Sequence, residues 1–297
     1  MILNYFQSNN FGDALNPYIF NHFLPDFFDS DPETSFVGIG SILGLKNVRE
    51  AKKKIVFSSG FAYGAIPKID DSFDIFCVRG PLTCEALKID KKLAISDGAI
   101  LIQYMDQKVL DKKYKYAYMP HWESMQKYDW KVICEMSDVH LIDPTSDSQS
   151  IITQLKQTEV LIAEAMHGAV VADALRVPWI PAKAYGGIND FKWKDWTSTF
   201  NLGYDPFKIR SLYDDTSFTR NVIREKTGYP LPLSSLSPII GIFKKYQDRS
   251  IIPKVVDEFQ MIKSLDPYLS QESILRSKGE QLLDKLDDVK KKYSVKN

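Results

Sequence analysis

The sequence predicts an α/β protein with two parallel-sheet domains that face a cleft, followed by extra C-terminal helices. Short apolar runs alternate with helical or loop segments along most of the chain, which is typical of a parallel sheet. Most runs end in Gly, Ser, Asp, Arg or His, so polar residues are expected to gather at the strand ends where open α/β sheets bind ligands. The 297 residues are enough for two domains of ordinary size.

The N-terminal domain is expected over residues 1–104. A helix is predicted from Ala14 to Phe23, after the turn that contains Gly12 and Asp13. The five expected strands are short apolar runs, each followed by small or polar residues, at 2–6, 35–43, 55–61, 75–83 and 93–99.

A charged segment, residues 105–115, separates this series from a second α/β domain over residues 116–252. Its expected strands lie at 116–121, 139–143, 160–163 and 179–181. Ser146 or Asp147 is expected to cap a helix over 148–157. Residues 253–297 have the apolar spacing of amphipathic helices, which we expect to pack on the domains; docking on a membrane or a partner is the alternative.

The composition excludes several classes of protein. Lys plus Arg equals Asp plus Glu at 38 each, which argues against a nucleic-acid partner. Three cysteines without a CxxC pair fit a reducing compartment, and no clustered ligand set predicts a metal site. Neither a signal peptide nor an apolar run of about 18 residues is present, so the expected location is the cytoplasm, free or peripheral at the inner face of the membrane.

The strongest signal for a site lies in residues 159–181. A buried strand ends just before His167 and Gly168, and a small-residue helix begins there and stops before Pro178. Because a helix N-terminus at a strand end suits anionic ligands, we predict a functional role for His167. The alternative is a buried turn histidine that hydrogen-bonds only to the backbone.

Other polar residues follow strands in the same way. Arg79, Asp97 and His121 each stand at a predicted strand end, and Asp13 either caps its helix or belongs to a loop over a ligand. The glycines near the second strand are spaced GxGxxxG, which is too weak a match to predict a dinucleotide.

Taken in order, these motifs resemble the polysaccharide pyruvyl transferases. The resemblance covers roughly residues 1–200, and the segment from Lys192 to Trp196 is similar to a subgroup that acts in exopolysaccharide synthesis. The motifs that carry it are Asn10-Phe11-Gly12-Asp13, Gly38-Ile39-Gly40-Ser41, Val78-Arg79-Gly80-Pro81, Ser96-Asp97-Gly98, Pro120-His121, Met166-His167-Gly168 and Val177-Pro178.

The resemblance implies a GT-B-like arrangement of two Rossmann-like domains. It also implies that the chain transfers the enolpyruvyl group of phosphoenolpyruvate to a sugar of a polysaccharide precursor, which forms a pyruvate ketal and releases phosphate. The acceptor would be a sugar on a lipid diphosphate or a nucleotide. Phosphoenolpyruvate would be the donor substrate, with no cofactor.

Site roles follow from the same resemblance. His167 would be the general acid or would stabilise the departing phosphate, and Asp13 or His121 would be the base. The residues expected at the donor are Arg79, Met166, His167, Gly168 and Lys183, and those expected at the acceptor are Asn10, Gly40, Ser41, Asp97 and Trp193. For Trp193 and the nearby Trp196, packing in the core is an equally good explanation.

One position departs from the family pattern. Many members carry an arginine two residues before the histidine, where this chain has Ala165. Arg79 is then the clearest cation for the donor, and the substitutes are Lys183, Lys192 and Arg176.

Two other functions compete with this interpretation. A glycosyltransferase of the same two-domain architecture would use a sugar nucleotide, and fold alone does not separate the two. A non-catalytic binding or scaffold protein is favoured by Ala165, but the presence of Arg79, His167 and Asp13 argues against it.

Overall fold

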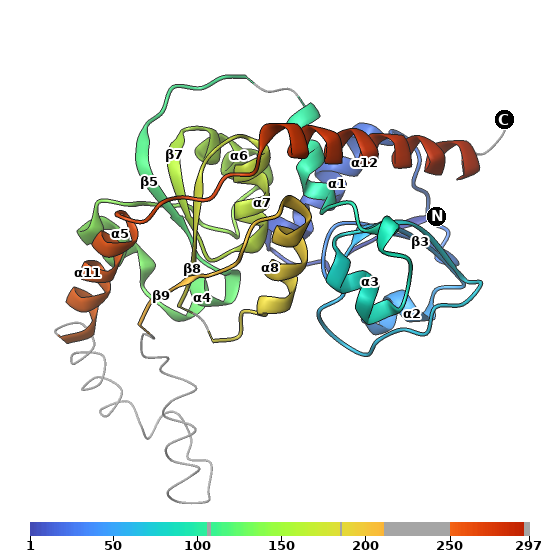
Figure 1. Ribbon diagram of the computed structural model, residues 1–297, viewed down its shortest axis with the longest axis horizontal. Coiled ribbons are helices and arrows are strands. Elements are labelled where there is room, and N and C mark those ends of the chain that lie inside the picture. Colours follow the sequence, from blue (N-terminus) through green and yellow to red (C-terminus); the bar gives the residue numbers. More distant parts are fainter. Residues whose placement is uncertain (106–107, 185, 211–249, 294–297) are drawn as a thin grey trace, which may run out of the picture.

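The computed structural model describes residues 1–105, 108–184, 186–210 and 250–293, and two parallel sheets organise them (Figure 1). The first sheet has the order β1-β2-β3-β4, with strands Ile2–Asn4, Thr34–Val37, Lys53–Ser59 and Phe73–Val78. The second has the order β6-β5-β7-β8-β9, with strands His140–Leu141, Tyr114–Met119, Thr158–Ala163, Trp179–Lys183 and Phe207–Lys208. Every strand pair is parallel, which confirms the predicted α/β class with two parallel sheets.

The fifth strand predicted for the first sheet, at 93–99, is wrong. Only one bridge forms there, between Val78 and Ala94, after the 3-10 turn η1 (Lys91–Leu93). The Asp97 side chain accepts a hydrogen bond from the Ala99 N–H, at 3.0 Å, and starts a second 3-10 segment, η2 (Gly98–Tyr104). The backbone therefore bends away from β4 before a ladder can extend. The short strand β9 was not predicted.

Helices follow most strands. In the N-terminal part, α1 (Phe11–Phe23) begins three residues before its predicted start, and the short helices α2 (Lys46–Glu50) and α3 (Pro81–Leu87) follow later. In the second part, Asp147 rather than Ser146 caps α6, since its carboxylate accepts from the Ser150 N–H at 2.9 Å. The helices there are α4 (Trp122–Lys127), α5 (Trp130–Ser137), α6 (Ser148–Lys156), α7 (Met166–Ala174) and α8 (Asp190–Thr197), with the 3-10 turn η3 (Ser198–Phe200).

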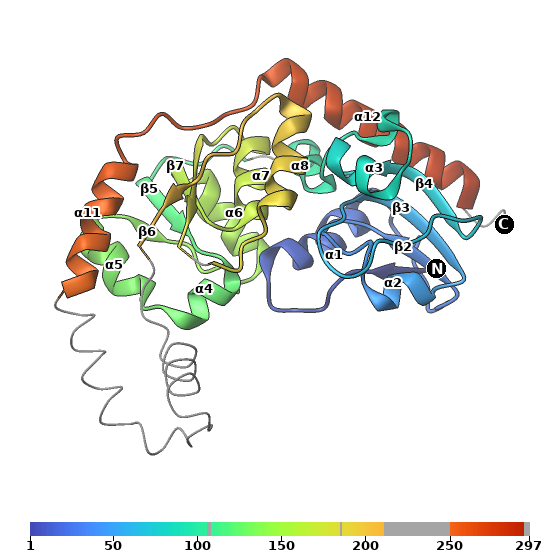
Figure 2. The same ribbon diagram turned by 60° about the horizontal axis from the view of Figure 1, so that its bottom comes forward.

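The C-terminal helices pack on the protein, as their apolar spacing predicted. Helix α11 (Ile252–Ile262) lies against α5, whereas α12 (Glu272–Tyr293) crosses back to contact η2 and β4 of the first sheet (Figures 1 and 2). The buried face of α12 is formed by Leu275, Leu282, Leu286 and Val289.

One hydrophobic cluster runs through both sheets. It includes Phe36 and Phe57 of the first sheet, Leu161 of the second, and the buried leucines of α12. The two sheets are therefore joined by continuous packing as well as by the chain. None of the helices in the described part of the chain is both long and apolar enough to span a membrane.

Candidate active site

A pocket of about 300 Å³ lies where loops after the strands of both sheets meet. It brings together seven of the residues predicted from the sequence, namely Asn10, Asp13, Gly40, Ser41, His121, Met166 and His167. The remaining lining residues are Phe6, Ile42, Leu45, Tyr63, Trp122, Glu123, Gly187 and Lys192.

His167 stands in the first turn of α7, between elements of both halves of the chain. Its Nε2 lies 3.5 Å from the Asp97 Oδ2 atom. On the other side, α1 approaches so closely that a Cβ atom at Gly12 would come within 2.0 Å of the His167 Nδ1 atom. Gly12 is therefore the residue that leaves room for this imidazole, which explains in physical terms why a glycine stands in the Asn-Phe-Gly-Asp loop.

Asp97 lies behind His167 and is fully buried. Burial raises the pKa of its carboxyl, but His167, Arg79 and the Ala99 N–H favour the anion more strongly, so the net pKa is lowered. The carboxylate is thus negatively charged at neutral pH and faces the His167 ring. The sequence placed Asp97 among the acceptor-binding residues, but its side chain does not line the pocket. Asp97 contacts the pocket residue His167 instead.

Asp13 lines the pocket from the first turn of α1. Its Oδ2 accepts hydrogen bonds from the Ser8 Oγ at 2.6 Å and from the Asn10 Nδ2 at 3.0 Å. Two side chains therefore orient this carboxylate. Of the two sequence interpretations, this arrangement favours a polar loop at a ligand over a helix cap.

His121 caps α4, where its Nδ1 accepts from the Glu123 N–H at 3.4 Å. Burial, together with the positive charges of Lys192 and Lys127, lowers the pKa of His121 to about 3. The imidazole is therefore neutral at physiological pH and can take part in hydrogen bonds with a sugar hydroxyl.

Glu164 was not predicted, yet it ties three strand ends of the second sheet together. The fully buried carboxylate accepts from the His121 N–H at 2.9 Å, the Ala184 N–H at 2.8 Å and the Tyr118 hydroxyl at 3.1 Å. An acidic residue inside the apolar run Ile162-Ala163-Glu164-Ala165 was the available signal. Glu164 fixes the turn that carries His121.

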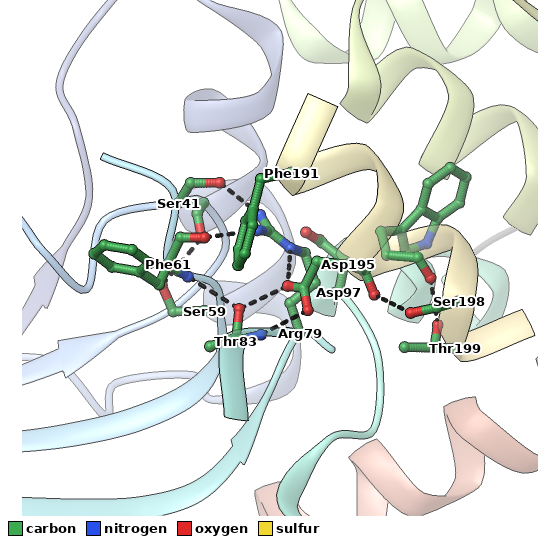
Figure 3. A network of polar contacts seen from close by, with 12 residues as sticks. Ser41, Ser59, Phe61, Arg79, Thr83, Asp97, Phe191, Asp195, Ser198 and Thr199 are labelled. Carbon is green, nitrogen blue, oxygen red and sulfur yellow. Dashed lines mark hydrogen bonds and ion pairs between the residues drawn. The ribbon is translucent and has the colours of Figure 1, made fainter. Parts of the chain in front are cut away.

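Arg79 does not contact the pocket directly, because its guanidinium is fully buried and surrounded by protein acceptors (Figure 3). Its Nε donates to Asp195 at 3.0 Å, its Nη1 to the Ser41 Oγ at 2.5 Å and its Nη2 to the Phe61 carbonyl at 3.4 Å. Thr83 adds two further hydrogen bonds to the Asp195 carboxylate. Arg79 therefore lies one layer behind the pocket wall, with Ser41 in front of it.

The other predicted cations differ in their surroundings. Lys183 donates to Asp190 at 2.6 Å, and the Arg176 guanidinium donates to the Ser270 carbonyl at 2.8 Å. Lys192, in contrast, stands in the pocket wall, where burial and the nearby charge of Arg79 lower the pKa of its ammonium to about 8.

Gly168 and Trp193 also lie outside the pocket wall. Gly168 backs onto Met119, since a Cβ atom there would come within 2.5 Å of the Met119 Sδ atom. Trp193 is fully buried and stacks on Tyr204, with ring centroids 4.9 Å apart, and Trp196 is buried beside it. Both tryptophans therefore pack in the core, which was the alternative explanation for them.

The aromatic side chains that do line the pocket are Phe6, Tyr63 and Trp122. Phe6 and Tyr63 are among the more exposed large apolar residues of the chain. Within the described ranges, no group of three or more His, Cys, Asp or Glu side chains is placed to hold a metal ion.

The family model described as polysaccharide pyruvyl transferase matches residues 8–185. The chain belongs to the polysaccharide pyruvyl transferase family. It is also 39% identical over 206 residues to the succinoglycan biosynthesis protein ExoV of Rhizobium meliloti (strain 1021), a match that covers 68% of this chain and 65% of that protein. About a third of that relative is therefore outside the match. No solved structure matches.

The matched region of this pyruvyl transferase family member contains the residues that build the pocket's centre. Gly12, Asp13, Asp97, His121 and His167 all fall within residues 8–185. Lys192 and helix α8 come after the matched region, so the pocket wall combines the family region with a segment beyond it.

Proposed function

We propose that this chain is an enzyme that moves the enolpyruvyl group of phosphoenolpyruvate onto a sugar of a polysaccharide precursor. The product is a pyruvate ketal, and phosphate is released. The observation that carries the proposal is the meeting of Asp13, His121 and His167, from both sheets, around one pocket. Membership of the pyruvyl transferase family and the name of the relative from succinoglycan biosynthesis support the reaction and the class of acceptor.

The reaction sets clear demands on a site. The methylene carbon of the donor is protonated, and the first sugar hydroxyl attacks the neighbouring carbon that carries the phosphate. Phosphate then leaves, and the second hydroxyl closes the ketal ring. One hydroxyl proton ends in the new methyl group and the other leaves with phosphate, so the equation balances without a cofactor. An acid, a base and a binding group for anions are needed.

His167 is our candidate for the acid. The Asp97 carboxylate next to Nε2 fixes the ring orientation, as carboxylates commonly do for catalytic histidines. With Nε2 turned to Asp97, Nδ1 is the nitrogen left for the proton transfer. The same proton could instead be given to the departing phosphate, as the sequence also suggested.

Asp13 is our candidate for the base. Its negative carboxylate is oriented by Ser8 and Asn10 and lines the pocket, so it can draw the proton from an attacking hydroxyl. His121, which is neutral, would instead hold a hydroxyl by hydrogen bonding.

The acceptor sugar would lie against the aromatic side chains of the pocket. Phe6, Tyr63 and Trp122 offer flat, partly exposed surfaces at its rim, in place of the buried Trp193. We propose a sugar carried on a lipid diphosphate or a nucleotide. With a lipid carrier, the enzyme would work at the inner face of the membrane, from a location that we propose to be the cytoplasm.

A thermal-shift titration tests the donor. Phosphoenolpyruvate should raise the melting temperature of the purified protein, because a ligand that binds the native state stabilises it. The shift should be lost in His167→Ala and kept in His22→Ala, which changes an exposed histidine of α1. Stabilisation by uridine-diphosphate sugars alone would overturn the proposal in favour of a sugar-nucleotide glycosyltransferase.

Product analysis tests the transfer itself. With a pyruvate-free oligosaccharide precursor, the enzyme should release one phosphate for each ketal methyl group that appears in the NMR spectrum. Phosphate release without a ketal methyl signal would contradict transfer.

A further inference from the structure

The Lys192 ammonium stands in the pocket wall over the face of an aromatic ring. It projects from α8 into the pocket wall, and its Nζ lies 5.9 Å from the centre of the Tyr63 ring. In the part of the chain that the structure describes, it makes no hydrogen bond and no ion pair. A half-buried ammonium that no carboxylate contacts directly gains from an anionic ligand that does.

The charged groups around Lys192 come from four elements. Asp13 of α1 and Glu123 of α4 carry negative charge on the pocket wall, and His121 and His167 complete its ring of titratable groups. Arg79, behind Ser41, adds positive charge from the end of β4. Asp13 and Glu123 favour the charged form of Lys192, but neither carboxylate forms an ion pair with it within 4.0 Å.

Two other cations predicted for the donor, Arg79 and Lys183, cannot take that place without breaking existing bonds. Arg79 is bound to Asp195 and Ser41, and Lys183 is bound to Asp190. Of these three cations, Lys192 is the one that lines the pocket and could contact a ligand there while the bonds of the other two stay intact.

We propose that Lys192 binds the anionic end of the donor, a small phosphorylated carboxylic acid. This assignment rests on the proposed function, because it takes phosphoenolpyruvate as that donor. It also gives α8 a role in the reaction, although this helix lies beyond the region that the family model matches.

Calorimetric titration of the full chain with phosphoenolpyruvate, at pH 7, tests this assignment. Lys192→Met should weaken binding at least tenfold, and Lys192→Arg, which keeps the charge, should stay within a few-fold of the wild type. Lys194→Met is the matched control, since Lys194 is exposed on the same helix, and it should bind normally. The ligand-free melting temperature of each variant verifies folding, and Lys192→Gln replaces Lys192→Met if the latter does not fold.

The pH dependence of binding adds a readout that a structural role would not change. Because the pKa of Lys192 is about 8, the affinity of the wild type should fall as pH rises above 8, whereas that of Lys192→Arg should not. Inorganic phosphate and pyruvate each carry one of the two anionic groups of the donor, so competition by each shows which group Lys192 binds. The competitor that carries the group bound by Lys192 should lose affinity in Lys192→Met.

The outcomes separate the two proposals. Equal binding of phosphoenolpyruvate by wild type and Lys192→Met would overturn the role of Lys192 and leave the donor intact. Failure of the wild type to bind phosphoenolpyruvate, with or without acceptor, would overturn both.

Discussion

The His167 ring is positioned by two residues far from it in sequence, Gly12 and Asp97. Gly12 supplies space on one side, and Asp97 supplies a carboxylate 3.5 Å from Nε2 on the other. Three short motifs that look separate along the chain therefore form one arrangement. The two contacts can be tested separately, because one is steric and the other is electrostatic.

Gly12→Ala tests the steric contact. The added Cβ would lie 2.0 Å from the His167 Nδ1 atom, so the ring must rotate out of its place. We expect ketal formation to fall at least a hundredfold, because small misplacements of a reacting group are costly. Activity measured beside Gly203→Ala, where a Cβ would meet nothing within 4 Å, isolates the effect. Unchanged activity in Gly12→Ala would argue against His167 as the acid.

Asp97→Asn tests the electrostatic contact. The amide oxygen can still accept from the Ala99 N–H, but the negative charge beside His167 is lost. We expect kcat to fall, with a shifted pH profile, and the KM for the donor to change little, because Asp97 does not line the pocket. A change confined to KM would contradict this positioning role.

The free energy of unfolding should depend on the same Asp97 charge. The pKa of Asp97 is lowered on folding, so the wild type gains stability above the usual aspartate pKa and loses it as pH falls through the folded-state pKa. Asp97→Asn should therefore be less stable than the wild type at pH 7, and the difference should shrink below about pH 4. Urea denaturation at several pH values measures this.

At this scale, sequence reasoning found the residues but not all of their partners. Asp13, His121 and His167 reached the pocket because polar residues that end parallel strands gather at one edge of a sheet. The same reasoning could not show that the acceptors for Arg79 come from Asp195, 116 residues later, or that Trp193 stacks on Tyr204. Those contacts depend on how the two halves of the chain pack together, which local patterns do not encode.

Among the elements, α8 connects the two halves of the pocket. Its Asp195 carboxylate binds Arg79 and Thr83, at the end of β4 and the start of α3 (Figure 3). Lys192, one turn earlier in the same helix, lines the pocket. The buried ion pair therefore sets the position of α8 and, through it, the position of Lys192.

Asp195→Asn tests this connection. It leaves the Arg79 guanidinium buried beside a neutral amide, and breaking a buried pair in this way costs about 3–5 kcal/mol. Chemical denaturation should show this loss, whereas Asp190→Asn, at the partly exposed start of the same helix, should cost about 1 kcal/mol or less. A loss of the same size in both variants would mean that the buried Arg79–Asp195 pair contributes no more stability than the partly exposed Lys183–Asp190 pair.

Most strands were predictable as elements because each one is a short apolar run with its own local signal, which the two-residue strand β9 lacks. The segment at 93–99 has the same signal, but the side chain of Asp97 captures a backbone N–H and turns the chain into η2. A polar residue that can bond to its own backbone competes with a strand, and the apolar run alone does not show which wins.

For the whole molecule, the continuous core and α12 argue that the two sheets unfold together. Helix α12 follows the second sheet in sequence but buries Leu282 and Leu286 against the cluster that also holds residues of the first. In addition, the Asp173 carboxylate accepts from the Ser270 N–H at 2.9 Å, which ties the segment before α12 to α7.

Leu286→Ala tests this coupling, because its side chain is almost fully buried where α12 crosses to the first sheet. The cavity should cost about 3 kcal/mol, or roughly 5 °C in Tm for a chain of this size. All five tryptophans lie between Trp122 and Trp196, so their fluorescence reports chiefly on the half built on the second sheet. If the core is one cooperative unit, the thermal transitions seen by fluorescence and by far-UV circular dichroism coincide and shift to lower temperature together. The control Asp284→Ala, on the exposed face of α12, should leave both melting temperatures unchanged. A tryptophan transition that stays in place while the circular dichroism curve splits would show two independent domains instead.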